Sequence, residues 1–463
     1  MINIIETIHE IGSLNAQKMY SDAFSMTTGL LSDVIYTYLL IPLLLGIGLY
    51  YTFKIKGGQI SNINHAIKLI ATPAKDENSI SPFKAFTISA ASHIGTGNIV
   101  GVAAAVSIGG PGAVFWMWIT ALIGGASSFV ENTLGQVFKE KNPDGTFKGG
   151  PAFYMEKALK KPKLAATFSV VIAIVYGINF NAMQANTIAA GFNSSFNLDK
   201  KIVALFLIIL AGIIIFGGLK RIADVTSLLV PVMAIIYMGV VLFIIIKNIK
   251  LVPHMFGVIF GGAFNLKAGF GGLFGTAILN GIRRGLFSNE AGMGSTPHAH
   301  ATAHVAHPVL QGYTAMVGVF IDTMVICTVT ALMILVTGAW TDKGLNGALV
   351  TQEAFTRAFG PTGTVLLAVA LGFFAFTTIV GWYYFGETNI RFLFGHKGLW
   401  PYRILVLLCI IAGSLQEVDL VWNTADLTNS LMVIPNIIAI IMLHKHVKNM
   451  SLHYETNGKE GSL

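Results

Sequence analysis

Apolar runs long enough to cross a lipid bilayer recur along this chain, and they constrain its fold more than any other feature. A transmembrane helix needs about 20 apolar residues, and we count about eleven such runs. They span residues 34–53, 83–108, 112–138, 164–190, 202–216, 225–246, 269–287, 309–337, 362–386, 399–415 and 420–443. With 54% hydrophobic and 11% charged residues, the chain lies far outside the range of soluble proteins. The sequence therefore predicts an all-α polytopic membrane protein with about 11 transmembrane helices.

Lysine and arginine are divided unequally between alternate loops. The loops on one side carry 20 of these residues and the loops on the other carry 8. Cytoplasmic loops are enriched in Lys and Arg, so we expect the N-terminus outside the cell and the C-terminus in the cytoplasm. The predicted organisation is an extracellular N-terminal segment 1–33, a multi-pass transmembrane domain 34–446 in the plasma membrane, and a cytoplasmic tail 447–463. The basic residues thus indicate topology, and we expect no nucleic-acid partner.

Two of the apolar runs contain stretches where a helix is expected to open. One is Ser89–Gly101, with glycines and short polar side chains, and the other is Gly275–Gly294 in the second half of the chain. Paired interruptions of this kind are typical of transporter binding sites. The alternative is close helix packing, because Gly97 and Gly101 also form a Gly-x-x-x-Gly pair.

The interrupted runs divide the chain into two halves. Without the first run, ten remain, as five plus five, with one interrupted run opening each set. Because five is odd, the second set must run inverted relative to the first. The sequence therefore predicts repeat one at about 81–248 and an inverted repeat two at about 267–446, as in inverted-repeat secondary transporters.

Three motifs carry a resemblance to a known family. They are Gly-Thr-Gly-Asn-Ile-Val-Gly at Gly95–Gly101, Gly-Gly-Pro at Gly149–Pro151, and Arg-Gly-Leu-Phe-Ser-Asn-Glu-Ala-Gly-Met-Gly-Ser at Arg284–Ser295. From roughly residue 30 to 445 the chain resembles the alanine or glycine:cation symporter family. The resemblance implies a leucine-transporter-type 5+5 inverted repeat plus one N-terminal helix. It also implies sodium-coupled import of alanine, glycine or a similar small neutral amino acid by alternating access. On this reading the protein is not an enzyme and uses no cofactor, with sodium as the coupling ion.

The resemblance also implies a set of sodium ligands. The second run would supply the carbonyls of Ala91 and Ile94, and the ninth would supply the Phe374 carbonyl with the Thr377 and Thr378 hydroxyls. Oxygen ligands alone suit a hard cation. The alternative is that paired threonines in a membrane helix bond back to their own helix.

For a zwitterionic substrate the sequence offers donors and acceptors near the two breaks. We expect amides freed near the first break to face its carboxylate, the seventh run to open at Asn280 and Gly281, and Trp382 to form a wall. The resemblance implies that a glutamine of a Gln-Ala-Asn element contributes to the site, which is Gln184 in the fourth run. The expected substrate-binding residues are Thr96, Gly97, Asn98, Gln184, Asn280, Gly281, Thr377 and Trp382. Ordinary helix packing is the alternative role for the residues of the fourth, seventh and ninth runs.

Five ionisable residues lie deep within apolar runs: Glu131, Arg283, Arg284, Glu290 and Asp322. An unpaired charge at a helix centre costs about 3 kcal/mol or more, so pairing is expected. We expect Arg283 or Arg284 to pair with Glu290, the alternative being that the arginines extend toward lipid headgroups.

Two other functions stay open. A proton-coupled small amino-acid permease would need a titratable group at the cavity, and His93 alone is near the first break. An intramembrane metalloenzyme would use the cluster His298–His307, where His300, His304 and His307 fall on one helical face at metal-ligand spacing. The alternative for these histidines is a solvated loop.

Overall fold

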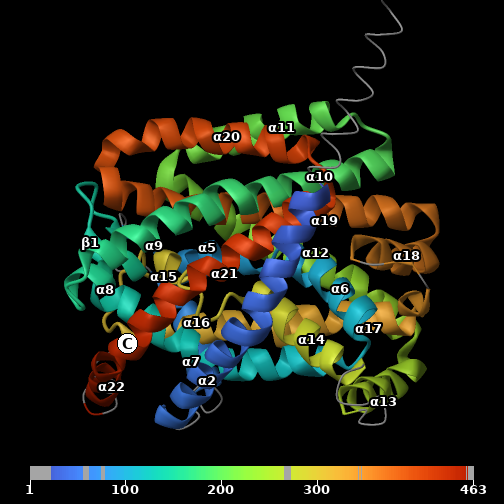
Figure 1. The fold of residues 1–463 in the computed structure, drawn as a ribbon, viewed down its shortest axis with the longest axis horizontal. Helices are drawn as coiled ribbons and strands as arrows, with labels where there is room; N and C mark the ends of the chain where they lie inside the picture. The colour runs from blue at the N-terminus through green and yellow to red at the C-terminus, as the bar shows by residue number, and fades with distance from the viewer. Residues whose placement is uncertain are drawn as a thin grey trace, which may run out of the picture.

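The structure, a computed structural model, describes residues 22–55, 62–73, 79–264, 273–342, 344–345, 347–454 and 456. The regular structure of these residues is helical, apart from a small antiparallel hairpin of β1 Glu140–Lys141 and β2 Phe147–Lys148. The helices pack side by side (Figure 1). The predicted all-α architecture is confirmed.

Every predicted apolar run coincides with helix. The first lies in a helix from Asp22 to Lys54 that includes the π-helical turn η1 Tyr36–Leu40 and then α2 Ile41–Lys54. The others fall on α5 Pro82–His93 with α6 Val100–Gly109, α7 Ala113–Val137, α9 Pro162–Ile174 with α10 Asn181–Phe196, α11 Lys200–Ile215, α12 Gly218–Lys247, α14 Leu273–Asn289, α16 Val309–Val319 with α17 Thr328–Val336, α19 Pro361–Phe394, α20 Leu399–Leu415 and α21 Val418–Met442. The seventh run begins outside the described residues, which resume at 273.

Shorter elements connect these helices. The short α-helices are α4 Ile63–Ile70, α8 Pro151–Lys157, α13 Val252–Ala263, α15 Pro297–His300, α18 Ala348–Phe359 and α22 His444–His453. The 3-10 turns are η2 Thr96–Asn98, η4 Ile249–Leu251, η7 Ala339–Thr341 and η8 Gly395–Gly398, and two further π-helical segments are η3 Val175–Phe180 and η6 Phe320–Cys327. Of the predicted N-terminal segment, residues 22–33 are helical, and the predicted tail begins within α22.

The number of membrane spans differs from the prediction. Seven helices of the described ranges are long and apolar enough to cross a membrane, and the bent pair α5 and α6 makes an eighth. The stretch Pro361–Leu415 counts once although it contains both α19 and α20. α11 and α14 have 16 and 17 residues, fewer than the roughly 20 that a full span needs. The chain is an all-α polytopic membrane protein, while eleven spans and the inverted repeats stay predictions.

The first predicted break is confirmed. α5 and α6 meet at an angle of 57° across the 3-10 turn η2. Gly95 precedes this turn with extended backbone, and a Cβ atom at Gly95 would lie 2.5 Å from Thr378 Oγ1 of α19. Asn98 closes the turn because its side-chain oxygen accepts the Gly95 N–H at 2.9 Å. A residue without a side chain is therefore required where the helix opens against α19.

The second break lies farther along the chain than predicted. α14 is a continuous helix through Asn280 and Gly281, and the Asn280 amide donates back to the Thr276 carbonyl at 2.9 Å. The chain leaves the helix only after Asn289, and Glu290 follows with a φ of +53°. The predicted break at Asn280 and Gly281 is wrong, because Gly281 serves packing: a Cβ atom there would lie 2.4 Å from the Ala113 carbonyl oxygen of α7.

Glu131 of α7 holds the second break in place. Its carboxylate accepts the N–H groups of Gly292 at 3.1 Å and Gly294 at 2.9 Å, and the Asn436 side-chain amide at 2.8 Å. Both glycines have positive φ angles of +80° and +83°, which side chains rarely allow. The open segment is thus fixed by α7 on one side and α21 on the other.

α19 is the core of the bundle. From Phe374 to Asn389 every residue except Phe376 is buried, and the helix packs against α5, α9, α10 and α12. At the edge of the fold α11 and α20 lie side by side (Figure 1). The half of α19 that faces α5 is therefore enclosed by helices.

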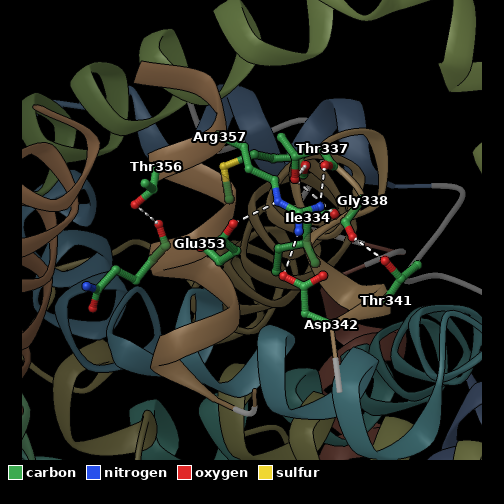
Figure 2. A network of polar contacts seen from close by, with 10 residues as sticks. Ile334, Thr337, Gly338, Thr341, Asp342, Glu353, Thr356 and Arg357 are labelled. Carbon is green, nitrogen blue, oxygen red and sulfur yellow. Dashed lines mark hydrogen bonds and ion pairs between the residues drawn. The ribbon is translucent and has the colours of Figure 1, made fainter. Parts of the chain in front are cut away.

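A polar network fixes α18 to the end of α17. Figure 2 shows Arg357 of α18 between Glu353 and Asp342, at 2.9 Å and 2.6 Å. The same guanidinium donates to the Thr337 carbonyl at 3.1 Å. Since these acidic partners reinforce its charged form, the pKa of Arg357 is raised. α18 also reaches the first break, where the Thr351 hydroxyl donates to the Ile99 carbonyl at 3.2 Å.

Candidate functional site

Gln184 is a buried amide without a partner. It lies in the first turns of α10 and is fully enclosed, yet neither its amide nitrogen nor its oxygen has a hydrogen-bond partner among the described residues. Its neighbour Asn186 donates to the carbonyls of Gly413 and Gln416, both at 2.9 Å. Leaving a buried polar group unsatisfied costs about 1–3 kcal/mol. A group of this kind suggests a ligand site.

The first break contributes a second such group. Thr96 is completely buried, and its hydroxyl has no partner among the described residues. A Cβ atom at Gly97 would lie 3.4 Å from the Phe287 ring, so Phe287 closes one side of the break. Phe287 also contacts Phe180, with ring centroids 5.7 Å apart. Because Gln184 follows Phe180 by one helical turn, both residues lie on one face of this helix.

Asn98 turns away from this region. Its amide nitrogen donates to Asp322 Oδ1 at 2.6 Å and to Ser288 Oγ at 3.2 Å. Asn280 and Gly281 are likewise separate, because Gly281 lies against Ala113 of α7 and Asn280 bonds within its own helix. The structure therefore does not gather all the predicted substrate residues into one site.

The predicted cation ligands lie where α5 meets α19. The Thr377 and Thr378 hydroxyls both donate to the Phe374 carbonyl, at 3.0 Å and 2.8 Å, which is the bonding that the alternative predicts. A Cβ atom at Gly381 would lie 3.3 Å from the Ala91 side chain of α5. α5 ends at His93, so the carbonyls of its last turn, including that of Ala91, lack the usual helical N–H partner. Ile94 is the C-terminal cap of the same helix.

Trp382 connects α19 to both breaks. Its indole N–H donates to Glu290 Oε1 at 2.7 Å, and Glu290 Oε2 accepts the Ser92 hydroxyl of α5 at 3.2 Å. The Trp382 ring also packs on Phe180, with centroids 4.7 Å apart. Trp382 thus contacts the opened segment after α14 directly and α5 through Glu290, while its role as a wall of the substrate pocket stays a prediction.

The ion pairs of α14 differ from those predicted. Arg283 pairs with Asp33 at 2.7 Å, and Arg284 pairs with Asp426 at 3.3 Å. The predicted pairing with Glu290 is wrong, because Glu290 lies beyond the helix end and turns toward Ser92 and Trp382. Arg283 and Glu290 are also seven positions apart, a rise of about 10 Å along a helix.

The histidines do not form a metal-binding group. α15 ends at His300, so the predicted helical face through His304 and His307 is wrong. His298 and His300 are fully buried rather than solvated, each with a partner for its Nδ1 atom. The described residues contain no group of three His, Cys, Asp or Glu residues able to hold a metal. The metalloenzyme hypothesis therefore has no site in this part of the chain.

His93 is enclosed at the end of α5. Its Nε2 atom lies 3.5 Å from Ser89 Oγ, while Nδ1 has no partner among the described residues. The ring packs near Gly318 of α16, where a Cβ atom would lie 3.6 Å from it. The His93 ring therefore faces α16.

A cavity of about 550 Å³ borders the candidate site, because Val100 after the first break and Asn186, two residues after Gln184, line it. Residues of α6, α10, α14, α18, α19 and α21 line it, among them Arg284, Gln352 and Trp422. Trp422 contacts Phe287 with ring centroids 5.9 Å apart, and the Arg284 guanidinium lies 5.9 Å from its ring centre. Phe287 in turn packs on Gly97. The aromatic pair therefore connects the cavity wall to the first break, which the cavity also meets directly at Val100.

Sequence reasoning missed the partners that hold the breaks. Glu131 and Glu290 were recognisable as ionisable residues in apolar runs, but their partners come from α5, α19 and α21. The unpaired state of Gln184 and Thr96 also depends on which residues surround them.

Comparisons with known proteins identify the family of this chain. The family described as the sodium:alanine symporter family matches residues 21–463. A Bacillus subtilis protein named probable sodium/glutamine symporter is 46% identical over 436 residues, covering 94% of this chain and 91% of the relative. The amino-acid carrier protein AlsT of the same organism is 43% identical, covering 95% and 94%. The sodium/alanine symporter of Methanococcus maripaludis is 40% identical, covering 87% and 91%. The chain therefore belongs to the sodium:alanine symporter family, whose members are transporters and not enzymes.

Proposed function

We propose that this protein is a sodium-coupled secondary active symporter that imports alanine, glycine or a similarly small neutral amino acid by alternating access. Membership of the family and relatives named for sodium/alanine and sodium/glutamine symport support sodium and an amino acid as the transported species. The small size of the substrate is our own inference.

The unpartnered amide of Gln184 is the observation that carries the substrate proposal. An amide offers both a donor and an acceptor, which suits the two charged ends of an amino acid. The unpartnered Thr96 hydroxyl and the backbone at Gly97 stand at the helix break, and Trp382 packs on Phe180, one helical turn before Gln184. We assign substrate binding to these four residues. Asn98, Asn280, Gly281 and Thr377 are not part of this assignment, because their described contacts serve other purposes.

Sodium would bind between α5 and α19. Its ligands would be the carbonyls of Ala91, Ile94 and Phe374 with the hydroxyls of Thr377 and Thr378. Both hydroxyls can keep donating to the Phe374 carbonyl while their lone pairs face a cation. A cation here would join the opened helix to the core helix, so sodium and substrate affinities would be linked reciprocally.

The route to the site would start at the 550 Å³ cavity. Its mouth includes Ser194, near the end of α10, on the side that the distribution of Lys and Arg predicts to be outside the cell. The Phe287 and Trp422 rings would then close the outer path, and their separation would open it. We accordingly expect the protein in the plasma membrane with its N-terminus outside.

Competition of labelled alanine uptake tests this proposal. Purified protein in liposomes would take up alanine under an inward sodium gradient, with glycine and unlabelled alanine competing and with glutamine competing weakly. Glutamine as the strongest competitor would overturn the small-substrate assignment. Uptake driven equally by a proton gradient without sodium would favour the proton-coupled permease instead.

A further inference from the structure

Two arginines share a single buried carboxylate where α19 meets α20. Glu387 is buried, and its Oε1 atom accepts Arg391 Nη2 at 2.6 Å. Its Oε2 atom accepts Arg403 Nη2 at 3.3 Å and the Tyr383 hydroxyl. The two arginine side chains are themselves largely enclosed, with exposed fractions of 17% and 16%. The cluster therefore holds two positive charges against one negative charge.

One further carboxylate lies near this cluster. Burial alone would raise the pKa of Asp144, but hydrogen bonds from Thr146 and the charges of Arg391 and Lys220 hold that pKa below its usual range. Among the described residues Arg391 forms its ion pair with Glu387 and not with Asp144. Lys220 balances Asp144 in a count of charge. The two arginines and Glu387 still leave one positive charge.

The guanidinium groups also have hydrogen-bond donors to spare. Arg391 Nε is buried and has no partner among the described residues. Nη1 of each arginine makes no hydrogen bond in that part of the chain, since Nη2 carries the contacts with Glu387 and Arg403 Nε donates to the Tyr383 hydroxyl at 3.0 Å. The planar donors of a guanidinium match the oxygens of a phosphate. Residual charge and spare donors together suit a phosphate group.

The network at Arg357 has the opposite balance of charge. That guanidinium lies between two carboxylates, those of Glu353 and Asp342 (Figure 2). Between α19 and α20, two arginines face one carboxylate instead. One arginine would be enough to pair with Glu387, so the joining of two helices does not account for the second.

Exposed aromatic side chains indicate that the cluster lies at the membrane surface. Trp400, three residues before Arg403, is 66% exposed, and Phe394, three residues after Arg391, is 63% exposed. The Arg403 guanidinium lies 5.5 Å from the ring centre of Phe216, which follows α11. Tryptophan is enriched where the hydrocarbon meets the headgroups. The distribution of Lys and Arg predicts that this side is cytoplasmic, where anionic lipids attract basic segments.

We propose that Arg391 and Arg403 bind the phosphate of an anionic phospholipid whose acyl chains lie against Trp400 and Phe394. The phosphate supplies the missing negative charge and accepts hydrogen bonds from the two spare Nη1 groups. Because Arg391 belongs to α19 and Arg403 to α20, the lipid also holds these helices together. A free phosphate ion offers the same oxygens but no acyl chains, so the exposed aromatic side chains favour the lipid.

The test measures lipid binding to the purified full-length protein by native mass spectrometry, with phosphatidylglycerol and phosphatidylcholine as probes. The wild type should retain phosphatidylglycerol in preference to phosphatidylcholine. Arg391→Gln and Arg403→Gln should each weaken phosphatidylglycerol binding roughly fivefold, the contribution of one basic residue near an anionic lipid surface. Each variant leaves the other arginine to pair with Glu387, which preserves the fold.

Glu387→Gln separates a phosphate site from an ion pair that only joins helices. Removing the carboxylate adds one positive charge to the cluster, so the affinity for phosphatidylglycerol should rise. A purely structural ion pair would lose stability without any gain in lipid affinity. Arg357→Gln is the matched control, because two carboxylates already balance that guanidinium. It should leave phosphatidylglycerol binding unchanged.

Three results would overturn the lipid site. They are equal phosphatidylglycerol affinity in the wild type and both arginine variants, equal retention of the two lipids by the wild type, and unchanged lipid affinity in a folded Glu387→Gln variant. Inorganic phosphate forms a separate arm: if it binds the cluster while phosphatidylglycerol does not, the site takes a free anion and the lipid proposal is wrong. None of these measurements requires uptake, so their failure would leave the proposed symport untouched.

Discussion

The indole N–H of Trp382 donates to Glu290 Oε1 at 2.7 Å, across 92 residues of sequence. This bond joins the core helix α19 to the opened segment that follows α14. Because Glu290 is buried, Trp382→Phe would leave a carboxylate oxygen without this donor while keeping an aromatic wall. We expect the variant to lower the melting temperature in detergent and to reduce alanine uptake, with a cost of about 1–3 kcal/mol.

Trp118→Phe is the control for that prediction. The Trp118 indole donates to the neutral Thr328 hydroxyl at 2.7 Å rather than to a buried carboxylate. Losing this hydrogen bond should destabilise the protein less than Trp382→Phe does. The rate of alanine uptake per folded protein should be unchanged. Equal loss of uptake in both variants would show that the Trp382 bond has no special role.

Gln184→Leu should reduce alanine affinity without destabilising the substrate-free protein. Leucine keeps the bulk of the side chain, and the amide that it removes has no partner in the described structure. The loss of one buried ligand contact is worth about 1–3 kcal/mol, or roughly 5- to 150-fold in affinity. Isothermal titration with alanine and a thermal melt measure the two effects.

Asn186→Leu, unlike Gln184→Leu, should destabilise the substrate-free protein. The Asn186 amide donates to two backbone carbonyls. Its removal should therefore lower the melting temperature of the substrate-free protein. Wild-type alanine affinity in Gln184→Leu would remove that residue from the binding site.

Gly281→Ala should destabilise the fold although the helix itself gains a better helix former. The new Cβ atom would lie 2.4 Å from the Ala113 carbonyl, and overpacking of this kind costs about 1–3 kcal/mol. Gly275→Ala on the same helix has nothing within 4 Å of its Cβ position and should leave stability unchanged or higher. A thermal melt in which both variants resemble the wild type would contradict the packing role of Gly281.

The predicted orientation can be tested with single cysteines at two exposed positions. Ser194 lies near the cavity mouth and Asn449 lies on α22. An impermeant thiol reagent applied to intact cells should label Ser194→Cys but not Asn449→Cys. The opposite pattern would reverse the topology.

Periodicity and composition are enough to predict the helices, because each apolar run must satisfy its backbone internally in lipid. They also locate the first break, where Gly95 and the following polar residues are adjacent in sequence. They misplace the second break, because Asn280 and Gly281 have the composition of an interruption but the contacts of a packed helix. The true opening is stabilised by Glu131, 161 residues away from Gly292.

The sequence predicts that the buried charges must pair, but it does not predict with which partners. The cost of isolated charge implies that Arg283, Arg284 and Glu290 need partners, but proximity in sequence selects the wrong ones. The actual partners of the arginines, Asp33 and Asp426, come from the first and last long helices. Asp322 shows the same limit, since no pattern in the sequence indicates that three neutral donors surround it.

The sodium site between α5 and α19 is the central claim, and Thr378→Val tests it most directly. Valine keeps the shape of threonine but removes a hydroxyl that stands against Gly95 at the first break. Thr388→Val is the matched control, since Thr388 is buried on the same helix with its hydroxyl on the Tyr384 carbonyl at 2.9 Å.

The measurement is alanine uptake into liposomes over a range of sodium concentrations. We predict that Thr378→Val raises the half-saturating sodium concentration about tenfold, equivalent to roughly 1.4 kcal/mol, and weakens alanine binding mainly at low sodium, while Thr388→Val matches the wild type. An unchanged sodium dependence in Thr378→Val, or equal uptake driven by a proton gradient in sodium-free buffer, would contradict this account.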